Sequence, residues 1–366
     1  MLYYLCLLED VWGPFRLFHY VTFRGVMALL TALIFILSIG PKVFAWLRAK
    51  KIKDIVRDAK DIKDLASLHA HKSQVPTMGG IVIIGAVVLS VLLWIRINVY
   101  AYGALFVGLI LGGIGFVDDA LKLKYKNSKG IASHWKWFVQ GLATFIVLYV
   151  LLSTPGVGTK IDALYLTFLK HPVLTSLPAS LLFLYWFFVI AGTSNALNLT
   201  DGIDGLAIGC SLTVAVTYAI FSYVTGHIVL SHYLHLPYLN GVEELSVLCL
   251  AIVGASVGFL WYNAYPAEIF MGDTGSLALG GWIGCIALMT QQAFTLIIVG
   301  FVFFIEALSV ILQVTSYKLF KQRCFKMSPL HHHFELMKIP ESKIIVRFWI
   351  VSFLCALLGL MTLKLR

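Results

Sequence analysis

The sequence predicts an all-α, polytopic integral membrane protein with about ten transmembrane helices. Of the 366 residues, 60% are hydrophobic and only 13% are charged, whereas soluble domains are roughly half apolar and a quarter charged. The apolar residues fall in repeated blocks of roughly 17 to 23 residues, the length that a helix needs to cross a bilayer. Basic residues are concentrated in a few of the intervening loops. Because no water reaches the bilayer core, each block must satisfy its backbone groups as a helix.

The apolar blocks place ten spans along the chain. In chain order we expect them at residues 22–40, 77–95, 100–117, 135–153, 177–192, 205–225, 245–260, 276–291, 294–316 and 344–363. An even number of crossings puts both termini on the same side of the membrane. We find no repeat and no low-complexity tract, so we expect residues 1–366 to form a single membrane domain.

The distribution of Lys and Arg predicts which side faces the cytoplasm. Twenty of these residues lie in one set of loops, at 41–76, 118–136, 193–204, 261–275 and 317–343. The other loops and both termini hold six. Cytoplasmic loops carry the excess of basic residues, so we expect the first set to be cytoplasmic and both termini to lie outside. We therefore attribute the net charge of +10 to the topology and to binding of membrane lipid and anionic ligands, and not to binding of nucleic acid.

The first basic loop contains apolar residues at helical spacing, with Lys, Arg and Asp on the opposite face. These apolar positions are Ile52, Ile55, Val56, Ala59, Ile62 and Leu65. The pattern is typical of an amphipathic helix lying on the membrane surface. A solvated spacer helix of mixed charge explains it equally well.

The first candidate functional residues lie at the end of the third predicted span. Asp118 and Asp119 are adjacent, so their carboxylates repel each other unless a cation or a proton accompanies them. A divalent cation with oxygen ligands would resolve the repulsion, and nearby lysines would hold phosphate oxygens. Four lysines follow: Lys122, Lys124, Lys126 and Lys129. The alternative is a charge pair that caps the loop at the membrane edge.

A polar ribbon follows the fifth span. Its members are spaced by three: Asn195, Asn198, Asp201 and Asp204. On helical geometry they share one face, and Gly202 and Gly205 would let the backbone turn and approach a ligand closely. The segment lacks the spacing of a calcium-binding EF-hand loop. Helix capping would explain one or two of these residues but not all four, so we expect ligand contacts here.

A glycine-rich segment precedes the eighth span. Its candidate residues are Asn263, Phe270, Gly272, Asp273 and Ser276. Asp273 can be a metal ligand, the glycines expose backbone amides, and the start of the next helix suits an anion. Phe270 could stack on a base. The alternative is an interhelical turn that contains an N-cap.

The last basic loop contains three consecutive histidines, His331, His332 and His333. Consecutive residues rarely converge on one tetrahedral zinc ion. Hydrogen bonding to a diphosphate or support of Mg²⁺ fits them better.

The ninth span carries a polar stripe on one face: Glu306, Ser309, Gln313 and Ser316. Such a stripe must face other helices or a wet cleft. Packing and site lining are equally good explanations for Glu306, whereas Gln313 lies nearer the predicted cytoplasmic end, which favours the site.

Taken together, these motifs resemble the polyprenyl-phosphate N-acetylhexosamine-1-phosphate transferases. The resemblance rests on Asp118-Asp119, the segments 195–205 and 270–276 and the histidine run, and it extends in motif order over essentially the whole chain. Two further segments, Lys72–Gly80 and Pro329–Glu335, resemble the branch that transfers phospho-N-acetylmuramoyl-pentapeptide. Ala120 stands where members often carry Tyr, a departure that concerns local packing.

The resemblance implies a Mg²⁺-dependent phosphotransferase of the bacterial cytoplasmic (inner) membrane. The implied substrates are UDP-N-acetylmuramoyl-pentapeptide and undecaprenyl phosphate, and the implied products are lipid I and UMP. A sister transferase that uses UDP-N-acetylglucosamine is the alternative. A transporter is less favoured, because transporters tend to place their polar sites near the membrane midplane and these carboxylates lie at one face. A homodimer is compatible with the sequence, which does not determine the oligomeric state.

The resemblance also assigns roles to individual residues. The implied catalytic residues are Asp118, Asp119, Asp273 and His332. Asp273 would bind Mg²⁺, with Asp118 and Asp119 beside it as further ligands or as groups that orient the lipid phosphate. The implied substrate contacts are Lys72, Thr77, Lys122, Lys126, Asn195, Asn198, Asp201, Asp204, Asn263, Phe270, Gly272, Ser276, Gln313, His331 and His333. Direct attack by the lipid phosphate and a two-step route through a phospho-aspartate both remain open.

Overall fold

The computed structural model describes residues 1–50, 75–125 and 130–365. Over these residues the chain is helical and forms no strand, apart from an isolated bridge between Leu164 and Leu174. The predicted all-α class is confirmed. The predicted amphipathic stretch at 52–65 and the candidates Lys72 and Lys126 lie outside the described residues.

Eight helices in the described part are long and apolar enough to cross a membrane. They are α1 (Val21–Ala49), α4 (Val99–Tyr125), α5 (Ser133–Ser153), α7 (Ala179–Thr200), α8 (Leu206–Gly226), α10 (Glu244–Asn263), α13 (Phe301–Phe320) and α15 (Glu341–Met361). The predicted spans at 77–95 and 276–291 form the helices α3 (Gly80–Trp94) and α11 (Gly272–Met289). Each of the ten predicted spans therefore corresponds to a helix, although α3 has only 15 residues.

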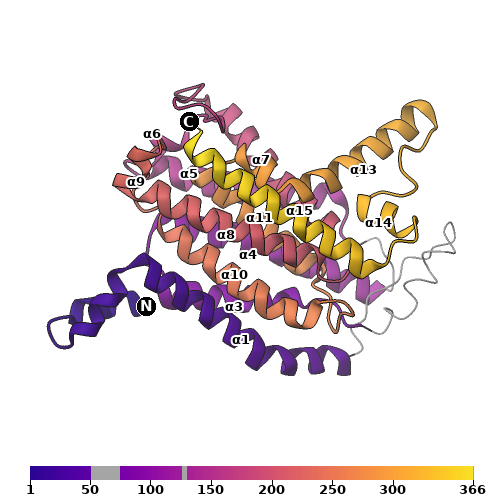
Figure 1. Cartoon of the computed structure of the whole chain (residues 1–366), viewed down its shortest axis with the longest axis horizontal. Coiled ribbons are helices and arrows are strands. Elements are labelled where there is room, and N and C mark those ends of the chain that lie inside the picture. The colour runs from indigo at the N-terminus through magenta and orange to yellow at the C-terminus, as the bar shows by residue number, and fades with distance from the viewer. Residues whose placement is uncertain (51–74, 126–129, 366) are drawn as a thin grey trace.

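The predicted span at 294–316 is the one that differs most from expectation. It begins as a short helix, α12 (Thr295–Val299), is interrupted at Gly300, and continues as α13. The interruption turns α13 away from the bundle, so that its far end projects beyond the neighbouring helices (Figure 1).

Helix α11 forms the centre of the bundle, because every residue from Thr274 to Met289 is buried. A helix that is enclosed on all sides needs neighbours that can approach closely, and glycines allow this in membranes. On α4, a Cβ added at Gly108 would collide with the ring of Trp282, and one added at Gly115 would collide with the carbonyl of Asp273. This close approach brings the ends of α4 and α11 together.

The two ends of the bundle hold different parts of the chain. Both termini lie at one end, together with the short helices α6 (Gly158–Ile161) and α9 (Ile228–Tyr233) (Figure 1). The histidine helix α14 (Leu330–Glu335) lies at the opposite end, with the C-terminal end of α1. This arrangement agrees with an even number of crossings.

The end that holds the termini contains a buried ion pair. Arg24 of α1 makes two contacts of 2.6 Å with the carboxylate of Glu244 of α10. The same carboxylate accepts a hydrogen bond from the backbone N–H of Arg96 at 2.9 Å, and Arg24 donates to the carbonyl of Trp94 at 3.2 Å. The pair therefore ties α1, α10 and the end of α3 together.

Candidate active site

Three carboxylates meet at the end of the bundle opposite the termini. Asp118 and Asp119 lie in the last turns of α4, and Asp273 lies in the first turn of α11. One oxygen from each of the three lies within 4.8 Å of the others. Asp118 and Asp119 are buried, whereas Asp273 is partly exposed. The structure therefore brings together the three aspartates that the sequence predicted as one site.

Two lysine ammonium groups face these carboxylates. The Nζ of Lys122 lies 2.6 Å from Asp118 Oδ2 and 3.1 Å from Asp273 Oδ2. The Nζ of Lys136 lies 3.0 Å and 2.9 Å from the same two oxygens. With all three carboxylates ionised, the two ammonium groups leave one negative charge unbalanced.

Lys136 is a site residue that no sequence motif predicted, because in the sequence it is one of several basic residues in a loop. It stands in the first turn of α5, which begins at Ser133. The sequence did contain a signal for Lys136. This residue follows the lysine-rich loop and lies near the start of the predicted span 135–153, at the same predicted side of the membrane as Asp118. The pattern did not show that α5 turns this side chain toward Asp273.

The backbone holds Asp118 and Asp119 in place. Asp119 caps the start of α11, because it accepts hydrogen bonds from the N–H groups of Asp273 and Thr274 at 3.3 Å and 3.0 Å, and from the Thr274 hydroxyl at 2.8 Å. The first N–H groups of a helix lack partners within the helix, so a carboxylate suits them. Asp118 Oδ1 accepts a hydrogen bond from the N–H of Ile131 at 2.6 Å.

The segment before α3 docks onto the segment before α11. The N–H of Phe270 donates to the carbonyl of Pro76 at 2.8 Å, and the N–H of Gly79 donates back to the carbonyl of Phe270 at 2.9 Å. A Cβ added at Gly272, where φ is +73°, would lie 2.8 Å from Asp119 Oδ2 and 3.0 Å from the Thr77 hydroxyl. The predicted residues Thr77, Phe270 and Gly272 therefore all lie beside the carboxylates.

Two of the polar residues near the end of α7, Asn195 and Asn198, have different kinds of partner. Asn198 donates hydrogen bonds of 2.9 Å to Asp273 Oδ1 and to the Ser276 hydroxyl, so three predicted site residues form one network. Asn195 points elsewhere, because its amide donates to Gln140 on α5 at 3.2 Å and to the carbonyl of Ala191 at 2.8 Å.

Asn263 and Asp204 connect two loops at this end of the bundle. The buried Asn263 accepts from the N–H of Gly205 at 3.1 Å and donates to the carbonyl of Ile269 at 2.8 Å. Asp204 accepts from the N–H of Ala267 at 3.0 Å. These polar side chains bond the backbone around the site, and Asp201 lies half-buried in the same turn.

The polar stripe of α13 faces the loop that follows it. Both amide atoms of Gln313 bond to the backbone of Phe325, at 3.0 Å and 2.9 Å. The hydroxyl of Ser316 donates to the carbonyl of Gln322 at 2.9 Å. Glu306 accepts from the N–H of Leu330 at 2.7 Å. The stripe therefore supports the segment that leads to the histidines, an arrangement that the sequence analysis did not consider.

The three histidines turn to three different partners. His331 Nδ1 lies 3.2 Å from Glu306 Oε2, and His332 Nδ1 lies 2.6 Å from Glu335 Oε2. His333 Nδ1 accepts from the N–H of Lys326 at 3.1 Å. The three rings therefore have separate partners in this structure. The ring of His331 packs against Gly202, so α14 lies beside the turn that follows Asn198.

The donor set of the three aspartates fits a divalent cation. The carboxylate oxygens converge within 4.8 Å, and Mg²⁺ prefers oxygen ligands. Asp118 Oδ2 is buried and has no hydrogen-bond donor other than the lysine ammonium groups among the residues that the structure describes. The unbalanced negative charge of the cluster adds to this fit. Mg²⁺ itself remains a prediction.

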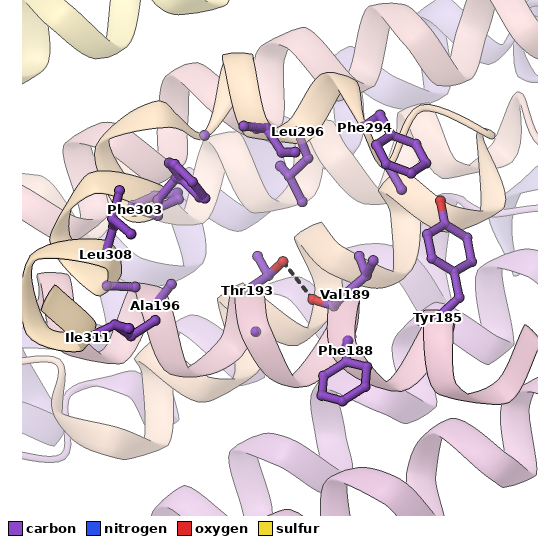
Figure 2. Close-up of a pocket in the computed structure, with 16 residues that line it drawn as sticks. Tyr185, Phe188, Val189, Thr193, Ala196, Phe294, Leu296, Phe303, Leu308 and Ile311 are labelled. Carbon is purple, nitrogen blue, oxygen red and sulfur yellow. Dashed lines mark hydrogen bonds between the residues drawn. The ribbon is translucent and has the colours of Figure 1, made fainter. Parts of the chain in front are cut away.

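An apolar groove runs along the outside of the bundle between α7 and the broken helix α12–α13 (Figure 2). It encloses about 290 Å³ and is lined almost entirely by apolar side chains. The hydroxyl of Thr193 is turned to the carbonyl of Val189 at 2.7 Å. The groove extends along α7 from Tyr185 to Ala196, two residues before Asn198. Residues two apart on a helix point to nearly opposite faces, so the groove reaches the end of α7 that carries Asn198 but on the other side of that helix.

A comparison with known protein families finds one match. The family model described as glycosyl transferase family 4 matches residues 101–291, just over half of the chain. The matched region begins near the start of α4 and ends just after α11. It includes all three aspartates, Lys122, Lys136 and Asn198, and stops before the histidine segment.

Proposed function

Because the chain belongs to glycosyl transferase family 4, we propose a specific substrate pair for it, UDP-N-acetylmuramoyl-pentapeptide as donor and undecaprenyl phosphate as acceptor. Family membership makes the chain a membrane phosphotransferase that moves a sugar 1-phosphate from a nucleotide to a polyprenyl phosphate. The products of the proposed reaction are lipid I and UMP. The convergence of three aspartates and two lysines at one end of a membrane bundle carries the proposal.

The donor assignment is supported by two segments beside this cluster. Residues 76–80 pair with the backbone of Phe270 and Met271, and the histidine helix packs against Gly202. These are parts of the segments whose sequences resemble the N-acetylmuramoyl-pentapeptide branch. We propose that Asn198, Phe270 and His331 bind the nucleotide and the diphosphate, and that His332 acts at the reacting groups. Predicted contacts such as Asn195, Asn263 and Gln313, whose amides bond neighbouring residues in this structure, would act by shaping the surrounding loops.

The charges of the cluster suit a diphosphate. We propose that Asp273 holds Mg²⁺ together with Asp118 and Asp119, and that Lys122 and Lys136 bind phosphate oxygens. When bound, Mg²⁺ would offset the negative charge that the diphosphate brings. Without a cation, one carboxylate is already unbalanced and the diphosphate would be repelled.

We propose that the reaction is a direct attack. An oxygen of the lipid phosphate bonds to the β-phosphorus, the bond from that phosphorus to the bridging oxygen breaks, and UMP leaves. A phosphate monoester has a second pKa of about 6, so it is mostly dianionic at neutral pH and needs no strong base. Hydrogen bonds to Asp119 and the lysine contacts of Asp118 weaken both carboxylates as nucleophiles. These contacts support the direct route over a phospho-aspartate.

The apolar groove supplies a path for the acceptor. Its stretch from Tyr185 to Ala196 covers eleven helical rises, or about 16 Å at roughly 1.5 Å per residue. We propose that the prenyl chain lies along this groove and that its phosphate passes around the end of α7 to reach Asn198 and Asp273. The whole chain then acts as one domain in a bacterial inner membrane, with the carboxylate end at the cytoplasm.

Release of UMP tests the proposal. Purified protein in detergent, with undecaprenyl phosphate and Mg²⁺, should release UMP from UDP-N-acetylmuramoyl-pentapeptide and form a lipid-linked product. UDP-N-acetylglucosamine should be a poor donor, and Asp273→Asn serves as the inactive control. Faster release from UDP-N-acetylglucosamine would favour the sister transferase instead.

A further inference from the structure

Glu306 is a carboxylate in the middle of an apolar helix, and it is fully buried. The groove face of α13 carries Phe303, Phe304 and Ala307, so Glu306 lies among residues that line the apolar groove but does not line it itself. A buried carboxylate in a membrane span is costly unless other groups satisfy it. Its partners therefore indicate why this position carries a charge.

Among the described residues, the hydrogen-bond partners of the Glu306 carboxylate come from the start of α14. Glu306 Oε2 accepts from the N–H of Leu330 at 2.7 Å, and Oε1 accepts from the N–H of His331 at 3.1 Å. The ring nitrogen Nδ1 of His331 lies 3.2 Å from Oε2. One side chain in the membrane therefore bonds both the backbone and the ring of the first histidine.

These contacts determine which ring nitrogen of His331 carries the proton. Both oxygens of Glu306 already accept hydrogen bonds from backbone N–H groups, as an ionised carboxylate does. A carboxylate in this state can only accept, so Nδ1 must be the donor. In the neutral ring Nε2 is then left with its lone pair, because the bond made by one nitrogen sets the role of the other.

The free end of the ring faces the turn between α7 and α8. His331 Nε2 is buried and has no hydrogen-bond partner among the described residues. It lies against Gly202, where an added Cβ would collide with it. Gly202 is exposed and lies in the turn that follows α7. A buried acceptor beside an exposed turn is placed to meet a ligand.

We propose that Glu306 is a positioning residue, which holds His331 in the tautomer with Nε2 as a hydrogen-bond acceptor toward a hydroxyl or amide N–H of the nucleotide-sugar. The ligand part of this proposal rests on the proposed function, whereas the tautomer does not. A carboxylate behind a histidine commonly sets its ring orientation in this way, and loss of such a partner typically costs about 10- to 100-fold in activity.

The competing explanation is that Glu306 only anchors the backbone of α14. The two explanations differ in a double-mutant cycle between Glu306→Gln and His331→Gln. If Glu306 acts through the ring, the second substitution should add little to the first. If it acts only through the backbone, the losses in kcat/KM should multiply. Glu335→Gln, which removes the carboxylate beside His332, is the matched control and should combine independently with His331→Gln.

The tautomer can be measured without substrate. Nitrogen-15 spectra of histidine-labelled protein should include a ring with a protonated Nδ1 and an unprotonated Nε2 that disappears in His331→Gln. The ring of His332, whose Nδ1 lies beside Glu335, should give a separate signal that His331→Gln leaves in place. In Glu306→Gln the His331 ring should lose this fixed tautomer. A protonated Nε2 in the unaltered protein, or an unchanged ring in Glu306→Gln, would overturn the inference even if the enzyme were fully active. Absence of transfer activity with an intact ring signal would instead count against the proposed function.

A second variant serves if Glu306→Gln does not fold. Gly202→Ala places a methyl group against Nε2 without touching Glu306. We expect it to displace the His331 ring and to lower kcat/KM about 10-fold or more. It should have no further effect in a His331→Gln background, and an equal effect in both backgrounds would contradict the proposal.

Discussion

The two ends of this bundle both bury charged side chains, but they balance them differently. At the end with the termini, Arg24 and Glu244 form a one-to-one pair whose side chains are only 1% and 3% exposed. At the other end, three aspartates face two lysines, and Asp273, Lys122 and Lys136 are 16%, 28% and 19% exposed. The first cluster is closed and neutral, whereas the second is open and has an excess of negative charge.

The difference indicates what each cluster is for. A closed, neutral pair gains nothing from a further ligand, so its contribution lies in holding α1, α3 and α10 together. An open cluster with unbalanced charge attracts a cation or a substrate, and charged residues near a membrane usually mark function. Experiments can therefore separate the two ends, since one should respond in stability and the other in catalysis.

The largest effect is expected from breaking the closed pair. Arg24→Met leaves Glu244 buried without its partner, which should lower the free energy of unfolding by about 3–5 kcal/mol. Turnover per folded molecule should stay near that of the unaltered protein. Unfolding in detergent and UMP release report the two quantities. The double variant Arg24→Met with Glu244→Leu should recover part of the stability, and a loss of turnover in folded protein would show that this end is not purely structural.

At the open cluster, Asp273→Asn should lower turnover about 10²- to 10³-fold, the usual cost of removing one well-placed electrostatic group. It keeps the size of the side chain and removes a charge that Mg²⁺ needs. The Mg²⁺ concentration required for half-maximal residual activity should rise. A titration of folded protein with Mg²⁺ measures both effects. Full turnover with an unchanged Mg²⁺ requirement would move the proposed ion to Asp118 and Asp119.

A smaller loss is expected from Lys136→Met. Hydrogen bonds to charged groups are worth about 1.5–3 kcal/mol, so kcat/KM should fall about 10- to 100-fold. Lys124 is exposed at the same end and contacts none of the three aspartates, so Lys124→Met is the matched control. Equal losses in the two variants would indicate general electrostatic attraction in place of a specific contact.

The smallest effect on activity is expected from cysteine substitutions that report only on which side of the membrane a loop lies. In a Cys324→Ser background, which removes the one exposed cysteine among the described residues, Lys160→Cys and Lys326→Cys should keep activity near that of their parent. A membrane-impermeant thiol reagent should label Lys160→Cys in intact cells and Lys326→Cys only after the membrane is opened. Labelling of both from one side would contradict the predicted topology.

The sequence predicted most of the architecture because the constraint is physical and local. A bilayer requires about 20 apolar residues for each crossing helix, so composition alone located ten helices. It could not show that the span at 294–316 breaks at Gly300, because that bend depends on how α12 and α13 pack against α7 and α15.

The residues of the candidate site were harder to predict from the sequence than the helices. Asp118, Asp119 and Asp273 were recognised because charge at a membrane face is rare, and the structure brings them together. Asn263 and Gln313 were predicted as substrate contacts, yet in this structure their amides bond the backbone of nearby loops. A polar side chain shows in sequence that it needs a partner, but it does not show which partner it finds.

Hydropathy and the distribution of charges along the chain by themselves determined the helical class, the positions of the ten long apolar segments and the end at which the charged motifs gather. Only the tertiary structure decided how charges pair across the bundle. It turned Lys136 toward Asp273, and it enclosed Arg24 with Glu244. It also placed Glu306 behind His331. The reason is that burial in a membrane is a property of single residues, whereas the partner of a buried charge depends on which helices touch.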